Sequence, residues 1–113
     1  MVTFDPRGGQ QNLAFEFELA RLSALVVDME KIRQGTRPGR LTEDAPILDR
    51  WVVGHRQIPC LIGLSTGHPR LKGEDRPIVT SDLWLMSEDR GWARTLSRWY
   101  QLGRPAANAS FDA

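Results

Sequence analysis

The chain is poor in cysteine and histidine, and this shortage excludes several kinds of site. Its 113 residues include one cysteine, Cys60, so no disulfide can form within the chain and no multi-cysteine zinc site can be built. Only two histidines are present, His55 and His68, and neither HExxH nor CxxC spacing occurs. Because zinc usually takes three or four protein ligands, we expect no bound metal.

Long apolar runs and net charge are also lacking. No segment approaches the roughly 20 apolar residues that span a bilayer, and residues 1–10 lack the basic start and apolar stretch of a signal peptide. Fifteen Lys and Arg against 14 Asp and Glu give a net charge of +1, too little for a strong field toward nucleic acid or an anionic membrane. We therefore expect a soluble, cytoplasmic protein with no membrane partner.

Glycine-rich nucleotide-binding motifs are absent as well. The sequence GLSTGHPR at 63–70 has neither the GK[ST] ending of a phosphate-binding loop nor a following helix pattern. No GxGxxG follows a predicted strand, so a dinucleotide site is not expected either. We expect no cofactor.

Helical periodicity is the clearest pattern that the sequence does contain. Apolar residues recur at steps of three and four from Phe15 to Ile32, Asn12 is suited to the N-cap, and Gly35 is suited to the position after the C-cap. The spacing predicts a helix over 13–34. Its apolar stripe would pack against the rest of the domain or, alternatively, form a homodimer contact.

The remaining elements are shorter. Residues 36–45 read as a surface connector, and a short helix is expected to follow Asp44, with Pro46 in its first turn, and to end at Gly54. Strands are predicted at 60–64, 78–86 and 92–102, joined by turns at 72–75 and 87–91. The segment 92–102 also fits a helix with Trp92, Leu96 and Trp99 on one face, but a strand is favoured.

These elements predict an α+β fold with one core, which 41% apolar residues and four tryptophans can supply. A long N-terminal helix and a short second helix would pack on a three-stranded antiparallel β-meander; a half-open barrel is the alternative. We expect a flexible arm at 1–11, a single domain at 12–104 and a flexible tail at 105–113.

Four short motifs resemble a known group of proteins. They are AP at 45–46, GHPRL at 67–71, TSDLW at 80–84 and GWARTLSRWYQLG at 91–103. The segment 45–103 that contains them resembles an uncharacterised family, a domain of unknown function, of short rhizobial and other alphaproteobacterial proteins. The resemblance implies a bacterial, cytoplasmic protein and supplies no catalytic or ligand-binding residue.

Arginines and aromatic residues gather near the C-terminal end, with no acidic residue between Gly91 and Ala109. The candidate partner-binding residues are Trp84, Arg90, Trp92, Arg94, Arg98, Trp99 and Tyr100. Such residues form hot spots in protein interfaces, and the favoured hypothesis is a non-enzymatic protein-interaction or regulatory module. Single-stranded nucleic acid, bound by phosphate contacts and base stacking, is the alternative. The arginines could instead pair internally with Glu43, Asp44, Asp49, Asp82 or Asp89.

A second candidate is a polar turn formed by His68, Thr80 and Ser81. The histidine follows Gly67 and precedes Pro69, where an imidazole commonly bonds backbone groups of a turn. A less favoured hypothesis is a small enzyme in which His68 is the base for Ser81 or Ser97, which requires these side chains to converge in a cleft. No GxSxG elbow is present, so we assign no catalytic residue.

Overall fold

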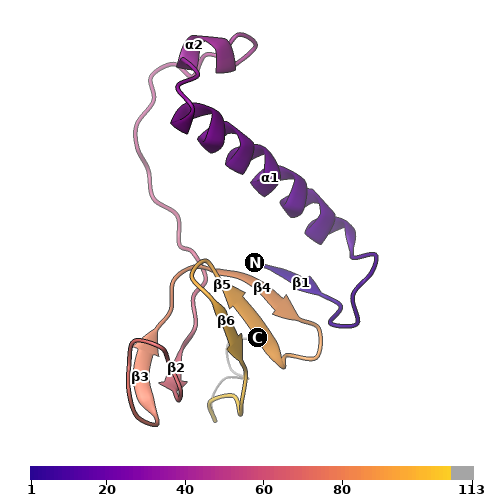
Figure 1. Cartoon of the computed structure of the whole chain (residues 1–113), viewed down its shortest axis with the longest axis vertical. Helices are drawn as coiled ribbons and strands as arrows, with labels where there is room; N and C mark the ends of the chain where they lie inside the picture. Colours follow the sequence, from indigo (N-terminus) through magenta and orange to yellow (C-terminus); the bar gives the residue numbers. More distant parts are fainter. Residues whose placement is uncertain (108–113) are drawn as a thin grey trace. The chain divides into compact units, whose positions relative to one another are not determined.

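The computed structural model describes residues 1–107, which divide into two compact units (Figure 1). Residues 12–56 form a helical unit, and residues 1–11 join the chain from residue 57 onward in a β-rich unit. Residues 108–113, most of the tail expected at 105–113, lie outside the described residues.

The long helix is confirmed to within one residue: α1 spans Leu13–Arg33. The side chain of Asn12 accepts a hydrogen bond from the N–H of Phe15 at 2.8 Å, as expected of an N-cap. At the other end Gly35 has a φ of 94°, and its N–H and that of Thr36 bond carbonyls of the last turn. No residue of α1 is buried, so the role of its apolar stripe, in a core or in a homodimer, stays a prediction.

The short second helix is predicted in the wrong place. The structure has a four-residue helix α2 at Pro38–Leu41, inside the expected connector, and no helix at 45–54. Proline has no backbone N–H, and at N1 this costs the helix no hydrogen bond. The hydroxyl of Thr42 also donates to the carbonyl of Pro38, so this single turn is locally stabilised. Arg50, by contrast, has a φ of 53°, which a right-handed helix cannot accommodate.

The strands form two sheets, so the expected three-stranded sheet is wrong in strand count and arrangement. The four-stranded sheet has the order β1-β4-β5-β6, and its strands are β1 (Val2–Phe4), β4 (Leu83–Ser87), β5 (Trp92–Thr95) and β6 (Trp99–Gln101). Strands β4, β5 and β6 are an antiparallel meander, and β1 adds to β4 in parallel. A separate hairpin pairs β2 (Ile62–Ser65) with β3 (Arg76–Val79).

Side-chain hydroxyls explain why two predicted strands are each split. Within 78–86, the Thr80 hydroxyl accepts from the N–H of Leu61 and donates to the carbonyl of Ser81, and the chain leaves β3 before it enters β4. Within 92–102, the Thr95 hydroxyl accepts from the N–H groups of Ser97 and Arg98 and closes a turn between β5 and β6. The helical alternative for 92–102 is therefore wrong.

The N-terminal strand is an element that the sequence did not predict. Val2 lies opposite Leu85, and Phe4 lies opposite Ser87. Three residues are too few to show a hydrophobic period, and the partner strand is about 80 positions away. Regular structure within 1–11 thus depends on a long-range pairing.

The core of the β-rich unit is small and centres on β4 and β5. Among the described residues the buried side chains are those of Leu83, Ser87, Ala93 and Thr95. The Ser87 hydroxyl accepts from the N–H groups of Gly91 (3.1 Å) and Trp92 (3.0 Å) and donates to Asp89 at 2.6 Å. This one buried hydroxyl therefore organises the whole turn between β4 and β5.

The hydrogen bonds to Asp89 in this turn lead us to expect that the stability of the fold depends on pH. Hydrogen bonds from the Ser87 hydroxyl and the N–H of Gly91 hold the pKa of Asp89 below its usual value. A lowered folded-state pKa means that the carboxylate stabilises the fold above the unfolded-state pKa, and that this contribution is lost as pH falls through the folded-state pKa. Asp89→Asn should therefore lower the urea midpoint at pH 7, and the difference should shrink below about pH 4. An equal difference at every pH would contradict the assignment.

Candidate functional site

The arginines and aromatic residues singled out in the sequence do not form one surface. Residues directly opposite each other on paired strands share a sheet face, and successive residues along a strand alternate. Arg94 is opposite Trp99 and two residues from Trp92, so these three lie on one face. Tyr100 is opposite Ala93 and lies on the other face. The turn after β5 thus separates residues that a single long strand would have kept together.

The first group, which we call the aromatic-arginine face, consists of Phe4, Trp92, Arg94 and Trp99. The rings of Phe4 and Trp99 meet edge to face with centroids 5.8 Å apart. Trp92 is 44% exposed and Trp99 is 54% exposed, whereas Arg94 is half-buried. Phe4 was missed in the sequence because nothing near it predicts β1.

The internal ion pairs that the sequence offered as an alternative for these arginines are not present in residues 1–107. The two ion pairs found there join Arg7 to Asp5 and Arg21 to Glu18. Arg94 therefore carries an uncompensated charge among the described residues.

Two residues of the sequence cluster lie elsewhere. Arg90 is exposed in the β4–β5 turn with a φ of 58°. Trp84 is half-buried at the register shift between Leu83 and Leu85, and its buried Nε1 has no hydrogen-bond partner among the described residues. Neither residue is paired with the strand positions of Arg94 or Trp99.

The second group lines a cavity of about 220 Å³, which we call the polar cavity. All three residues of the predicted polar turn line it, together with Arg98 and Tyr100. Among the described residues, its lining consists of His68, Leu71, Ile78, Val79, Thr80, Ser81, Ser97, Arg98 and Tyr100. The loop after β2, strand β3, the β3–β4 bend, the β5–β6 turn and strand β6 supply these residues. The sequence suggested the polar members but not that β6 would lie beside them.

Short hydrogen bonds hold the polar cavity in shape. The hydroxyls of Ser81 and Ser97 are 2.8 Å apart, and the N–H of Ser97 donates to the Ser81 hydroxyl at 3.2 Å. Nδ1 of His68 accepts from the N–H of Arg70 at 3.0 Å, which is the turn role expected of this histidine. The rings of His68 and Tyr100 have centroids 6.3 Å apart.

The convergence of His68, Ser81 and Ser97 meets one requirement of the enzyme hypothesis. A serine nucleophile also needs a hydrogen bond to its base, and none joins His68 to either serine within residues 1–107. With Nδ1 accepting from Arg70, a neutral imidazole carries its proton on Nε2 and presents a donor. This arrangement is suited to donating hydrogen bonds.

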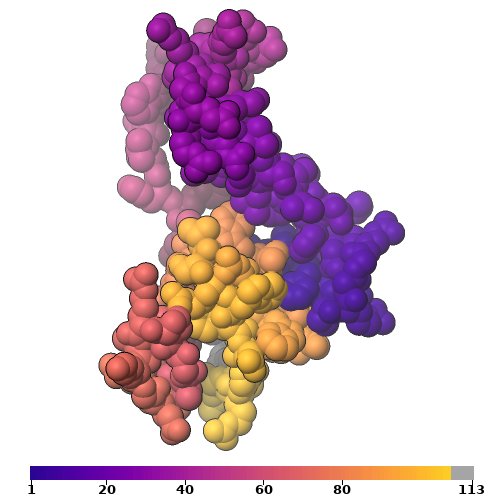
Figure 2. Space-filling view, in the orientation of Figure 1, coloured from indigo at the N-terminus to yellow at the C-terminus, as the bar shows by residue number. Residues whose placement is uncertain are grey.

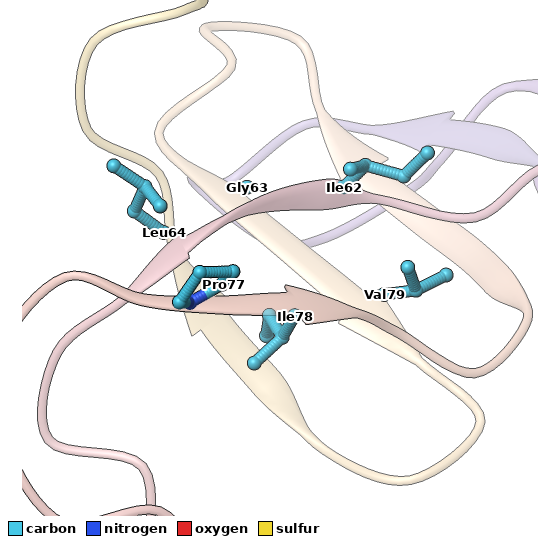
Figure 3. Close-up of a pocket in the computed structure, with 6 residues that line it drawn as sticks. All are labelled: Ile62, Gly63, Leu64, Pro77, Ile78 and Val79. Atoms are coloured by element: carbon cyan, nitrogen blue, oxygen red, sulfur yellow. The ribbon is translucent and has the colours of Figure 1, made fainter.

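The β2–β3 hairpin carries an apolar depression of about 340 Å³. Ile62, Leu64, Pro77 and Val79 share one face of the hairpin, while Ile78 points to the other (Figure 3). Ile62 is 79% exposed, and Figure 2 shows the hairpin as a lobe beside the C-terminal strands. The sequence predicted Ile62, Leu64, Ile78 and Val79 as strand residues, but it predicted neither Pro77 in a strand nor the exposure of one face of the hairpin.

The described chain contains neither a membrane-spanning helix nor a cluster of metal ligands. No helix within residues 1–107 combines the length and apolar character that crossing a bilayer requires. The same residues contain no group of three or more His, Cys, Asp or Glu side chains arranged to hold a metal ion.

Comparison with known proteins identifies a family. No curated protein and no solved structure matches the chain. Residues 32–112 match the model of a family of unknown function, DUF6634. The match includes the polar cavity, Arg94 and both exposed tryptophans of the aromatic-arginine face, and it leaves out β1 and most of α1. Because the match covers well over half of the sequence, the chain belongs to the DUF6634 family, and the expected membership of a family of unknown function is confirmed.

Proposed function

We propose that the chain is a small, non-enzymatic binding module that engages an acidic surface of a protein partner through the aromatic-arginine face. One observation carries the proposal: Arg94 has no ion pair among residues 1–107 and lies on the same sheet face as the half-exposed Trp92 and Trp99. The motif resemblance adds the expectation that it acts in the bacterial cytoplasm.

The chemistry of these side chains supports a protein partner. A guanidinium makes two parallel hydrogen bonds to one carboxylate, and such charge-assisted bonds are stronger than neutral ones. Each indole adds a large apolar area, and Arg and Trp are enriched among residues that dominate interface energies. An acidic side chain on the partner would therefore pair with Arg94 while its apolar neighbours cover Trp92 and Trp99.

The fold holds this face in place before binding. Arg94 lies on β5, between the buried residues Ala93 and Thr95. The edge-to-face contact with Phe4 restricts the Trp99 ring. An ordered β5 backbone and a restricted Trp99 ring lose less conformational entropy on binding, which favours affinity.

Reversing the charge of Arg94 tests the proposal. The unchanged chain and two variants are each used to capture proteins from a lysate of cells that make the chain. The variants are Arg94→Glu and the control Arg70→Glu, which makes the same charge change in the β2–β3 connection. The binding constant of each selectively lost protein is then measured by tryptophan fluorescence. We expect Arg94→Glu to weaken binding by about thirtyfold or more and the control to have little effect.

Two results would contradict the hypothesis of a protein partner bound through Arg94. Arg94→Glu folding normally and capturing the same proteins with unchanged affinity would overturn the proposal. A fluorescence titration with single-stranded oligonucleotides tests the alternative, because stacking would quench Trp92 or Trp99 and added salt would weaken binding. A saturable, salt-sensitive quench that Arg94→Glu abolishes would favour nucleic acid instead.

A further inference from the structure

The polar cavity gathers hydrogen-bond donors that have no acceptor in the described chain. The Arg98 guanidinium makes no hydrogen bond or ion pair with any of residues 1–107, and the Tyr100 hydroxyl has no partner there. Nε2 of His68 is equally free, because it is Nδ1 that accepts from Arg70. No aspartate or glutamate among residues 1–107 lines the cavity. A solvent-accessible site of this composition is suited to an anion.

The serine pair contributes one further donor. Each hydroxyl has a single hydrogen, and the short contact between Ser81 and Ser97 uses one of the two. The Ser81 oxygen also accepts from the N–H of Ser97, which fixes the pair against the backbone. Whichever serine donates to the other, one hydroxyl hydrogen remains to bond a ligand.

Size and geometry decide which anion fits. A volume of about 220 Å³ is below the range of roughly 300–1,000 Å³ that is typical of pockets for larger organic ligands. His68, Arg98 and Tyr100 come from a loop, a turn and a strand, and together they bring more than two donor groups to one cavity. A tetrahedral group with several acceptor oxygens meets such donors better than a planar carboxylate with two.

We infer that the polar cavity is a binding site for a phosphate group, with Arg98 as the charged anchor and His68, Tyr100 and one hydroxyl of the Ser81–Ser97 pair as donors. The phosphate is either free or the terminal group of a small phosphate monoester. This inference goes beyond the proposed function and does not depend on it, because Tyr100 and Trp99 lie on opposite faces of β6.

Backbone amide shifts in a 15N-labelled sample of the full chain test the inference. The chain is titrated in separate arms with inorganic phosphate, with phenyl phosphate and with acetate. We expect saturable shifts of the Ser97 and Arg98 amides with phosphate, whereas the indole N–H of Trp92 stays unchanged as an internal control. Tighter binding of inorganic phosphate would identify a free-phosphate site, and tighter binding of phenyl phosphate a monoester site; both results support the inference.

Matched variants assign the contacts. Arg98→Gln should weaken phosphate binding at least about tenfold, since a charge-assisted hydrogen bond is lost, whereas Arg94→Gln on the other face should leave it unchanged. Tyr100→Phe keeps the ring and should weaken binding severalfold. The inference is overturned by an absence of saturable shifts with both phosphates, by acetate binding as tightly, or by equal losses in Arg98→Gln and Arg94→Gln. Arg94→Gln also separates the two hypotheses, because it should impair partner binding alone.

Discussion

Replacing Ser87 by alanine is expected to lower the free energy of unfolding by about 2–3 kcal/mol. The Ser87 side chain is 1% exposed and is the acceptor for the N–H groups of Gly91 and Trp92. Alanine would leave the N–H of Trp92 without this acceptor and would release Asp89, to which the hydroxyl donates. Urea unfolding followed by tryptophan fluorescence measures the loss.

Ser97→Ala is the matched control for this change. The Ser97 side chain is exposed, and its hydroxyl bonds only the hydroxyl of Ser81 within the described chain. The same chemical deletion should therefore cost less than about 0.5 kcal/mol. Equal losses in the two variants would show that burial of the Ser87 hydroxyl does not organise the β4–β5 turn.

Leu83→Ala is the second change with a large expected effect, a loss of about 2–5 kcal/mol in unfolding free energy. Leu83 is 5% exposed and lies opposite the buried Thr95. Truncation removes apolar area from a small core and leaves a cavity that few neighbours can fill. Thermal unfolding monitored by circular dichroism measures the change.

Leu64→Ala makes the same truncation on the uncovered face of the β2–β3 hairpin. Leu64 is 67% exposed, so its loss should change stability by no more than about 0.5 kcal/mol. The two substitutions together test the burial pattern of the β-rich unit. If Leu64→Ala cost as much as Leu83→Ala, the apolar face of the hairpin would be covered in solution.

The long helix was predictable because all of its signals are local. Asn12 caps it, apolar residues recur at helical spacing, and Gly35 ends it in a left-handed conformation. The second helix was misplaced because single-turn helices depend on few residues: Pro38 and Thr42 stabilise one turn, while the apolar spacing after Pro46 forms none. Helix prediction thus succeeded where many weak local preferences agree.

The strands were predicted less well, because their ends and partners depend on individual side-chain and backbone contacts. Residues with high β-propensity were recognised at 78–86 and 92–102, but propensity does not show where a hydroxyl will end a strand. The strands end where the hydroxyl of Thr80 accepts from the N–H of Leu61 and the hydroxyl of Thr95 accepts from the N–H of Arg98. The β1–β4 pairing joins distant segments, and no local pattern encodes it.

The sequence predicted which residue types would form the candidate sites, but not which of these residues would share a surface. A continuous strand over 92–102 would place Arg94, Arg98 and Tyr100 on the same side, since they are separated by even numbers of positions. The turn at 96–98 assigns Arg94 to the aromatic-arginine face and Arg98 to the polar cavity instead. His68 and Ser81 also line the cavity, and they come from other segments of the chain. Only the fold brings these segments close to Arg98, so the sequence does not show their proximity.

The parallel pairing of β1 with β4 affects the order in which the sheet is completed during translation. A ribosome makes Val2–Phe4 well before the strand that accepts them, which is about 80 residues later in the chain. Helix α1 consists of local contacts and is able to form while β4 is still unsynthesised. Strand β1 is therefore made before α1 but acquires its native hydrogen bonds only after β4 has been made.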